Sequence, residues 1–115
     1  MAHIIVVKLV RTDRYIKDLK RLGVTASEVA RLEGQVASDP LTGDVIPGLN
    51  GLRKLRFGFG GRGKRGGGRA VYFLILAEDV AVMIFAYGKS SQEDLTNEQK
   101  RAALALIREM TDGEG

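Results

Sequence analysis

The chain contains no cysteine and no tryptophan, and it has one histidine and two prolines among 115 residues. The lack of cysteine excludes a disulfide scaffold and thiolate metal sites, and it is typical of a reducing compartment. No segment approaches the roughly 20 apolar residues of a membrane-spanning helix. The start of the chain lacks a signal-peptide pattern, because Lys8 and Arg11 interrupt a short apolar run. These absences predict a cytoplasmic protein that makes no membrane contact.

The scarcity of histidine also limits the chemistry that the chain can perform. His3 is the single histidine, and a histidine-based proton relay needs a second titratable partner. Glu78 and Asp79 are typical of a turn, whereas Glu93 and Asp94 are typical of the approach to a helix. Neither acidic pair indicates a metal site, so we expect no metal and no cofactor.

What the chain does have is a concentrated positive charge. No Asp or Glu occurs between Asp44 and Glu78, so residues 45–77 carry +7 in a chain whose net charge is +4, and the remainder sums to −3. Clustered cations bind polyanions by displacing counterions from a phosphate backbone, without reading its sequence. The cluster therefore predicts a nucleic-acid partner. Its members are Arg53, Lys54, Arg56, Arg62, Lys64, Arg65 and Arg69.

Two glycine patterns in this stretch resemble nucleotide-binding motifs but lack the context that those motifs need. The glycines from Gly58 to Gly63 have the spacing of a dinucleotide fingerprint, and with Lys64 they make most of a P-loop. A P-loop needs Ser or Thr after its lysine, where this chain has Arg65, and both motifs need a helix directly behind the glycines. A strand-like run at residues 70–76 follows instead, so we exclude ATP and NAD.

The apolar periodicity predicts a single α+β domain over residues 1–115, with the element order β-α-α-β-β-β-α. A β-branched run at residues 4–10 predicts a first strand that is buried on both faces or nearly so. Helically spaced apolar residues that end at Gly23 predict the first helix. Thr25 and Glu28 form a capping-box pattern, which predicts a second helix that ends near the first proline.

The middle of the chain predicts an antiparallel meander of three strands. Alternate residues of a strand point to the same side, so Lys54 and Arg56 are expected to share one face of the first strand. The strands are expected at residues 52–57, 69–76 and 80–87, after a turn-rich connection at residues 41–51.

The end of the chain predicts one more helix. Thr96 and Gln99 form a second capping-box pattern, and an apolar stripe follows at helical spacing. We expect residues 111–115 to fray. The stripe consists of Ala103, Leu104, Ile107 and Met110, and the aromatic core residues are expected to be Phe57, Phe73 and Phe85.

Lys, Arg and Tyr side chains are sufficient to cleave RNA, because RNA carries its own nucleophile in the ribose 2′-hydroxyl. An enzyme then needs to align that hydroxyl, stabilise the pentavalent phosphate with cations, and supply a proton to the leaving oxygen. Amines that are crowded by other cations have lowered pKa values and can transfer protons near neutrality. The same cations are also consistent with passive phosphate contacts, and the residues alone leave both interpretations open.

Five motifs occur in order along the chain: Gly43-Asp44-Val45-Ile46-Pro47-Gly48, Gly51-Leu52-Arg53-Lys54-Leu55-Arg56, Gly63-Lys64-Arg65-Gly66-Gly67-Gly68-Arg69, Val71-Tyr72 and Tyr87-Gly88-Lys89. Together they resemble the HigB branch of the RelE toxin superfamily over residues 39–107, and the preceding part matches only in plan. The resemblance implies a microbial-RNase-like or RelE-like fold with a twisted antiparallel sheet. It also implies a toxin of a type II toxin–antitoxin pair, a metal-independent, ribosome-dependent mRNA endonuclease that inhibits translation. The implied partners are a cognate antitoxin of helix-turn-helix type and the ribosome with its mRNA and rRNA.

The resemblance also implies roles for single residues. Lys54 and Arg56 match the strand cations that contact the scissile phosphate or activate the 2′-hydroxyl. Arg69 matches the arginine that stabilises charge in the transition state. The other basic residues are assigned to contacts with mRNA or the ribosome, and they are Arg53, Arg62, Lys64 and Arg65.

The chain departs from the RelE pattern near the end of the last strand. RelE has Gly-Lys-Arg there, whereas this chain has Gly88-Lys89-Ser90. The arginine that would act as general acid is therefore absent. Lys89, or Tyr87 beside it, is the nearest substitute as proton donor.

Two other functions remain open. The related ParE-like toxins share this fold but act on DNA gyrase without being nucleases, and a non-catalytic basic RNA-binding module would have a similar composition. The set Lys54, Arg56, Arg69 and Lys89 favours the nuclease, because a gyrase poison needs no convergent cations on its sheet.

Overall fold

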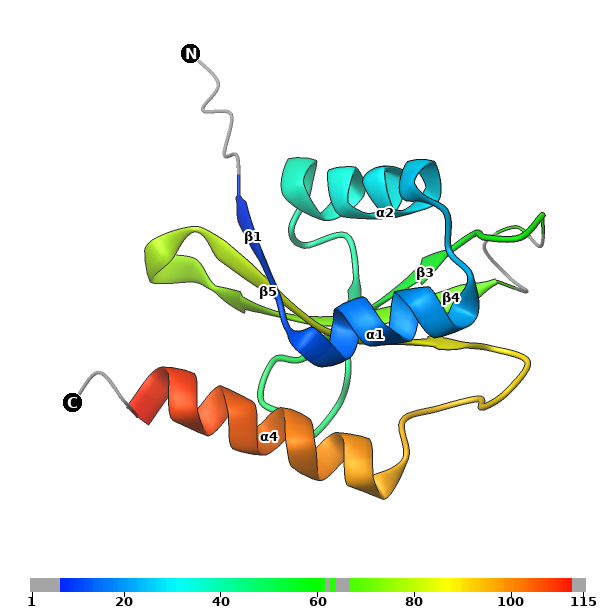
Figure 1. The fold of residues 1–115 in the computed structure, drawn as a ribbon. Coiled ribbons are helices and arrows are strands. Elements are labelled where there is room, and N and C mark those ends of the chain that lie inside the picture. Colours follow the sequence, from blue (N-terminus) through cyan, green and yellow to red (C-terminus); the bar gives the residue numbers. More distant parts are fainter. Residues whose placement is uncertain (1–6, 62, 64–66, 113–115) are drawn as a thin grey trace, which may run out of the picture.

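The computed structural model describes residues 7–61, 63 and 67–112. Its elements are β1 (Lys8–Arg11), α1 (Asp13–Leu22), α2 (Ala26–Ser38), β2 (Asp44–Val45), β3 (Arg53–Phe57), β4 (Gly68–Ile75), the short 3-10 helix η1 (Leu76–Glu78), β5 (Val80–Gly88) and α4 (Asn97–Asp112). The strands form one sheet in the order β1-β5-β4-β3-β2, with α1 and α2 on one face and α4 on the other (Figure 1). The predicted α+β class is confirmed. Within the described ranges, no helix is long and apolar enough to cross a membrane.

The sheet is an antiparallel meander that is extended at both edges. β3, β4 and β5 pair antiparallel as predicted, whereas β1 pairs with β5 in parallel, with Lys8 opposite Val80. At the other edge, β2 pairs antiparallel with β3 and places Asp44 opposite Lys54. The turn-rich connection predicted at residues 41–51 therefore also contains a short strand, which forms because it can bond to the free edge of β3.

The prediction of a first strand buried on both faces is wrong for the residues that the structure describes. Val7 is buried, but three of the four residues of β1 are exposed, and residues 4–6 lie outside the described ranges. β1 is an edge strand, so one side has no neighbouring strand to cover it. Its β-branched composition is typical of strands in general and does not distinguish an edge from the centre.

The predicted helix caps are confirmed. The Thr25 hydroxyl accepts the Glu28 backbone N–H at 3.2 Å, and the Glu28 carboxylate accepts the Thr25 N–H at 2.8 Å. Thr96 and Gln99 make the same reciprocal pair at the start of α4, at 3.1 and 2.9 Å. α4 continues to Asp112, so residues 111 and 112 are helical rather than frayed, and residues 113–115 lie outside the described ranges.

The two faces of the sheet bury separate apolar clusters. Tyr15, Leu19, Leu32 and Val36 of α1 and α2 pack against one face, together with Tyr72. The cluster on the other face joins α4 to the sheet and contains Leu52, Val71, Phe85, Ala103 and Ile107. The predicted core aromatics Phe57 and Phe85 are buried, and Phe73 is half-buried against the second cluster.

An irregularity in β5 decides which face its last residues occupy. Val71 pairs with Phe85 but the next residue of β4, Tyr72, pairs with Met83, so Ile84 is an extra residue in β5. Such a bulge reverses the alternation of side chains along a strand. Phe85, and Tyr87 two residues on, therefore lie on the face opposite Met83.

In the described part of the chain, β5 has no neighbouring strand on the β1 side beyond this bulge, and hydrogen bonds from Thr12, the N-cap of α1, and to Asp18 of α1 take its place. β1 pairs with β5 only as far as Met83. The Thr12 hydroxyl then donates to the Ile84 carbonyl at 2.8 Å, and the buried Asp18 carboxylate accepts the Ala86 N–H at 3.0 Å. These bonds fix the end of β5, which contains Tyr87 and is followed directly by Lys89.

A buried polar network joins α1, α2 and β1. The Glu33 carboxylate accepts hydrogen bonds from the Tyr15 hydroxyl at 2.9 Å and from Arg11 Nε at 2.8 Å. Tyr15 is fully buried and Glu33 is 7% exposed. Because an unpaired buried polar group is costly, this network requires the three elements to keep one relative position.

We expect the protein to lose stability above about pH 10, the ordinary pKa of a tyrosine. Burial raises the pKa of each of the three tyrosines, Tyr15, Tyr72 and Tyr87. As the pH rises, the unfolded chain therefore releases phenol protons before the folded chain does, which favours unfolding. Urea unfolding at several pH values, with phenolate absorbance as a second readout, measures this. Phenolate that appears near pH 10 without unfolding would contradict it.

Candidate active site

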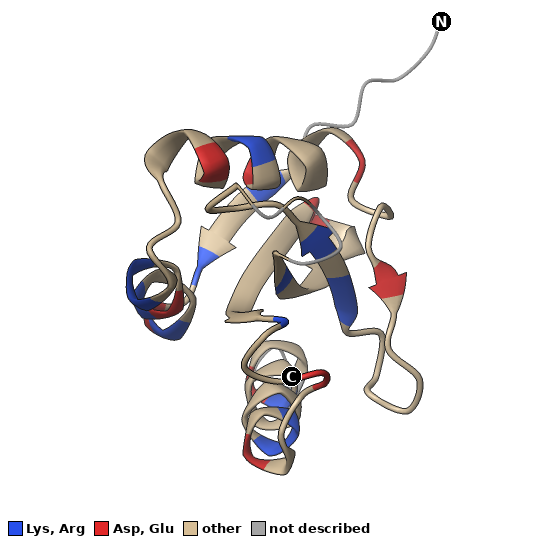
Figure 2. Ribbon diagram, turned by 90° about the vertical axis from the view of Figure 1, so that its right-hand side faces the viewer, with Lys and Arg blue, Asp and Glu red and all other residues tan. Residues whose placement is uncertain are grey.

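The predicted cations meet in one cavity on the face of the sheet that α4 partly covers. The cavity has a volume of about 330 Å³. Its basic lining residues come from β3, β4 and the segment after β5, and they are Lys54, Arg56, Arg69 and Lys89. Its walls come from the Asp44–Pro47 segment on one side and from Glu93 and Asp94 on the other. Figure 2 shows basic and acidic segments close together at this part of the sheet.

Strand alternation places Lys54 and Arg56 in this cavity. Leu52, two residues before Lys54, belongs to the cluster under α4, whereas Leu55 packs on the α1 and α2 side. The predicted shared face of Lys54 and Arg56 is thereby confirmed, because both line the same cavity. Arg56 is exposed and Lys54 is half-buried.

Arg69 stands at the buried end of the cavity. It is 4% exposed, and its Nη1 donates to the Gly68 carbonyl at 2.9 Å. Arg56 lies directly opposite it on β3. Burial lowers the pKa of Arg69, and the nearby charge of Arg56 lowers it further. Two like charges on neighbouring strands are unfavourable, so this pair is suited to an anion placed between them.

Tyr87 lies beside Arg69 but under the surface of the cavity. It is opposite Arg69 in the pairing of β4 with β5, and it is 1% exposed. Its hydroxyl is a buried polar atom without a hydrogen-bond partner among the described residues. Burial and the charge of Asp94 raise the pKa of Tyr87, and Arg69 lowers it. The structure therefore brings Tyr87 next to the site without placing it on the lining, whereas Lys89 is exposed and lines the cavity.

Three carboxylates on the walls are features that the sequence analysis did not assign to the site. They are Asp44, Glu93 and Asp94. Lys54 Nζ lies 3.8 Å from Asp94 Oδ1, an ion pair between the floor and the wall. A passive phosphate-binding surface gains nothing from carboxylates at its rim, because they repel a polyanion. In the sequence, Asp44 occurs within the motif at residues 43–48, and Glu93-Asp94 precedes a helix, a pattern that is equally typical of a favourable helix dipole contact.

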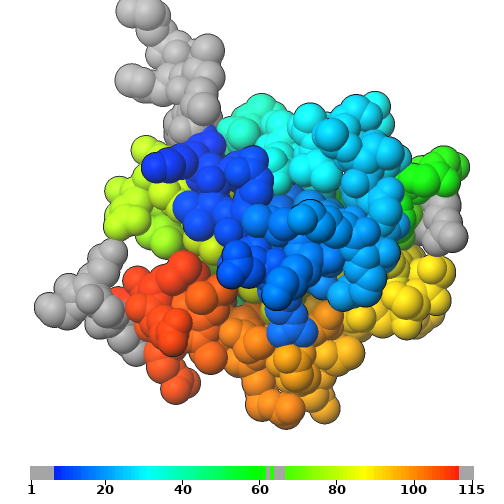
Figure 3. Space-filling model, viewed as in Figure 1, coloured from blue at the N-terminus to red at the C-terminus, as the bar shows by residue number. Residues whose placement is uncertain are grey.

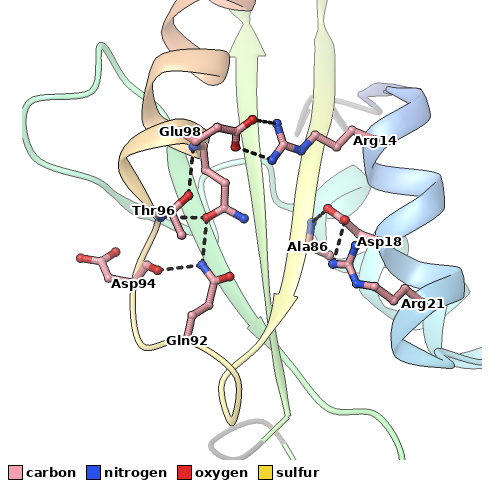
Figure 4. A network of polar contacts seen from close by, with 9 residues as sticks. Arg14, Asp18, Arg21, Ala86, Gln92, Asp94, Thr96 and Glu98 are labelled. Carbon is pink, nitrogen blue, oxygen red and sulfur yellow. Dashed lines mark hydrogen bonds and ion pairs between the residues drawn. The ribbon is translucent and has the colours of Figure 1, made fainter.

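The wall that contains Asp94 is held by polar contacts on both sides (Figure 4). Gln92 Nε2 donates to the Asp94 carbonyl at 2.7 Å and to Gln99 Oε1 at 2.8 Å. Asp94 Oδ1 accepts the Leu95 N–H at 2.8 Å. The segment between β5 and α4 is therefore tied to the first turn of α4, which fixes the direction of the Asp94 side chain.

α4 is in turn fastened to α1. Arg14 donates to both oxygens of the Glu98 carboxylate, at 2.9 and 2.6 Å. The guanidinium carbon of Arg14 also lies 4.9 Å from the centre of the Phe85 ring, in cation–π geometry. The surfaces of α1 (blue) and α4 (orange) adjoin in the space-filling view (Figure 3). Helix α1 therefore holds both the end of β5 and, through α4, the cavity wall that contains Asp94.

The opposite wall is positioned by Tyr72. Its hydroxyl donates to the Pro40 carbonyl at 2.8 Å and accepts the Gly43 N–H at 2.9 Å. A Cβ atom at Gly43 would lie 2.8 Å from Tyr72, so only glycine fits this close approach. This contact explains physically why the motifs at Gly43 and Tyr72 occur together, because they hold the segment that carries Asp44.

Of the remaining basic residues assigned to RNA or the ribosome, Arg53 is the one that the structure describes, and it does not line the cavity. Arg53 points to the other face of β3, and its Nη1 donates to the Gly43 carbonyl at 2.6 Å and to the Leu41 carbonyl at 3.3 Å. This geometry gives Arg53 a structural use on its own chain. Three cations of the glycine-rich segment lie outside the described residues, so their role stays a prediction: Arg62, Lys64 and Arg65.

The two ends of the glycine-rich segment are fixed. Gly60 N donates to Glu28 Oε2 at 2.8 Å, which ties the start of the segment to α2. The buried Phe59 ring lies 5.6 Å from the Phe57 ring. Where the chain enters β4, a Cβ atom at Gly68 would lie 2.5 Å from the same Phe57 ring, so no other residue fits. Arg69 is the next residue, so the tight packing at Gly68 also fixes the position of its backbone.

The described part of the chain contains no group of three or more His, Cys, Asp or Glu residues that could hold a metal ion. What the cavity offers is four cations, three carboxylates and a buried phenol close behind them. Such a set can bind one phosphate group, stabilise negative charge that develops on it, and exchange protons with neighbouring oxygens.

Comparisons with known proteins identify the fold. No known family model matches the chain. The structure resembles that of the E. coli toxin RelE, in the free state of a double arginine-to-alanine mutant, with a TM-score of 0.58 and 15% sequence identity over 89% of this chain and 97% of RelE. A chain of the RelBE2 toxin–antitoxin complex from Mycobacterium tuberculosis gives a TM-score of 0.49 at 12% identity, over 76% of this chain and 97% of that one. The likeness to RelE confirms the predicted RelE-like fold.

Proposed function

We propose that this protein is the toxin of a type II toxin–antitoxin pair and that it inhibits translation by cleaving mRNA on the ribosome. One observation carries the proposal: cations from β3, from β4 and from the segment after β5 converge in one cavity bordered by carboxylates, and they are Lys54, Arg56, Arg69 and Lys89. A gyrase-binding toxin or a passive RNA-binding module needs no such convergence. The resemblance of the sequence motifs to the HigB branch, and of the fold to RelE, supports the same function.

The cavity is suited to stabilising a phosphate under attack by the neighbouring 2′-hydroxyl. Arg69 is buried and fixed, so its guanidinium can meet the growing charge without reorganisation, and Arg56 shares that charge from the next strand. Lys89 lines the cavity on its exposed side and is the proton donor that we assign to the leaving 5′-oxygen. Tyr87 then acts from behind, by supporting Arg69 rather than by touching the RNA.

Alignment of the substrate is the part that the protein does not supply by itself. An open groove with no histidine pair has little means to hold a flexible single strand in line for attack. We therefore assign this task to the ribosome, which would present the mRNA in its decoding site. A cognate antitoxin, of the helix-turn-helix type that the HigB resemblance implies, would block the cavity or its approach until the toxin is needed.

Brief induction of the protein without an antitoxin tests this function. We expect growth arrest, loss of translation and new transcript 5′ ends that are confined to translated regions. The Lys54→Ala/Arg56→Ala double variant is the matched control, and it should leave transcripts intact. Mapping of transcript ends, together with a DNA-break assay, distinguishes the alternatives. DNA breaks with intact transcripts would indicate a gyrase poison, and intact RNA that copurifies with the protein would indicate a binding module.

A further inference from the structure

Asp94 lines the cavity, but the roles given above to the four cations leave this carboxylate without a function. Its carboxylate borders the cavity, pairs with Lys54 and extends away from the Gln92–Gln99 contact that holds its backbone (Figure 4). We propose that Asp94 is the proton acceptor that activates the 2′-hydroxyl of the RNA. This inference rests on the proposed function, because it names a further residue of the same reaction.

The chemistry of the lining favours a carboxylate for this task. The ordinary pKa of an ammonium or guanidinium group lies well above neutrality, so such a group accepts a proton there only after its pKa has been lowered, whereas a carboxylate needs no such change. Tyr87 is a phenol whose pKa is raised by burial, and it is closed off from the lining. The groups of the cavity that are ready to accept a proton are therefore its carboxylates, Asp44, Glu93 and Asp94.

Position then distinguishes Asp94 from the other two. Among the described residues, it is the cavity carboxylate within ion-pair distance of a cavity cation, with 3.8 Å between its Oδ1 and Lys54 Nζ. The Leu95 N–H holds that same oxygen at 2.8 Å, which directs the carboxylate. The charge of Asp94 also raises the pKa of the buried Tyr87 hydroxyl, and Tyr87 is paired with Arg69.

The proposed step is balanced within the cavity. The O–H bond of the 2′-hydroxyl breaks and its proton passes to the Asp94 carboxylate, while the 2′-oxygen forms a bond to phosphorus. The bond from phosphorus to the 5′-oxygen breaks, and that oxygen takes a proton from the Lys89 ammonium. The products are a 2′,3′-cyclic phosphate and a 5′-hydroxyl. A proton must then return from Asp94 to Lys89, directly or through water, so no cofactor is consumed.

The test is single-turnover cleavage by Asp94→Asn on programmed ribosomes, beside a ribosome-binding assay with an mRNA that carries a 2′-deoxy nucleotide at the cleavage site. We expect the cleavage rate to fall about 100-fold, in the range typical of general bases, while binding stays equal or becomes tighter. Asp94→Glu should recover part of the rate. Glu109→Gln is the control, because it removes an exposed carboxylate of α4 that does not line the cavity, and its rate should change less than about threefold.

A pH profile separates proton transfer from a merely structural role. The wild-type rate should fall at low pH as its acceptor becomes protonated, and Asp94→Asn should lose that dependence while retaining the unfolding free energy of the wild type. Asp94→Asn that cleaves as fast as wild type, or faster because a competing carboxylate is gone, would overturn this inference alone. A wild-type protein that cleaves no mRNA on ribosomes would overturn the proposed function together with it.

Discussion

Replacement of Arg69 by alanine should slow the cleavage step about 100-fold or more, on the order of 3 kcal/mol of transition-state stabilisation, with a much smaller loss of ribosome affinity. Arg69 is the most buried cation of the cavity, at 4% exposed, and its backbone is fixed directly after Gly68. A preorganised guanidinium contributes most where charge grows during the reaction. Arg69→Lys should restore only part of the rate, because an ammonium retains the charge but loses the two-pronged donor geometry. Single-turnover cleavage on programmed ribosomes measures both variants.

Two controls make the Arg69 result specific. Arg31→Ala removes an exposed arginine from α2, on the side of the sheet that faces away from the cavity, and it should leave the rate unchanged. Urea unfolding of Arg69→Ala shows whether the variant is folded. Removal of a buried charge beside Arg56 relieves repulsion, which offsets part of the packing that is lost. If folded Arg69→Ala cut at the normal rate, Arg69 would be a structural residue or a simple phosphate contact.

Purified protein should cleave mRNA on programmed ribosomes at least about 1,000-fold faster than the same RNA free in solution. The reason is that the ribosome would align the attacking 2′-hydroxyl, a large contribution to the rate that the protein does not supply by itself. The cavity is open and has no histidine among its described lining residues, so free RNA would sample many geometries for each productive one. Equal amounts of protein are compared on ribosome-bound and free transcripts under single-turnover conditions. The control for affinity is a transcript that the protein binds equally well on the ribosome and free in solution. Comparable rates in the two states would remove the ribosome from the mechanism.

The parts of the fold that depend on neighbouring residues could be predicted from the sequence. The caps at Thr25 and Thr96 use side chains three residues apart, and the alternation in β3 places Lys54 and Arg56 together without any other element. Each of these features is local. Local geometry is what a single sequence encodes most directly.

The parts that depend on distant pairing could not be predicted in the same way. The parallel pairing of β1, which makes it an exposed edge, depends on where the chain returns after some 70 residues. The bulge at Ile84, which turns Tyr87 toward the side of the cavity, depends on a mismatch between β4 and β5. β2 forms because the Tyr72 hydroxyl and the edge of β3 meet the Asp44 segment.

The candidate site also has a part that could be predicted from neighbouring residues and a part that depends on residues distant in the sequence. A cluster of cations is visible as composition, because charge of one sign is concentrated within residues 45–77. The carboxylates that border it could not be assigned in this way. Asp94 is 40 residues after Lys54, and the two side chains pair only because β4 and β5 lie between them in the chain and return it to the same part of the sheet. Arg53 shows the converse, because it belongs to the cluster in sequence but points to the other face of β3 and bonds to Gly43.

Analysis of the RNA ends made by purified protein on programmed ribosomes, with no added metal ion and a chelator present, tests most directly whether the cavity cleaves RNA through its own 2′-hydroxyl. We expect each cut to leave a 2′,3′-cyclic phosphate and a 5′-hydroxyl, and a 2′-deoxy nucleotide at the cut site to abolish cleavage. Ends that carry a 5′-phosphate and a 3′-hydroxyl, or a 2′-deoxy transcript cut at the normal rate, would contradict attack by the 2′-hydroxyl.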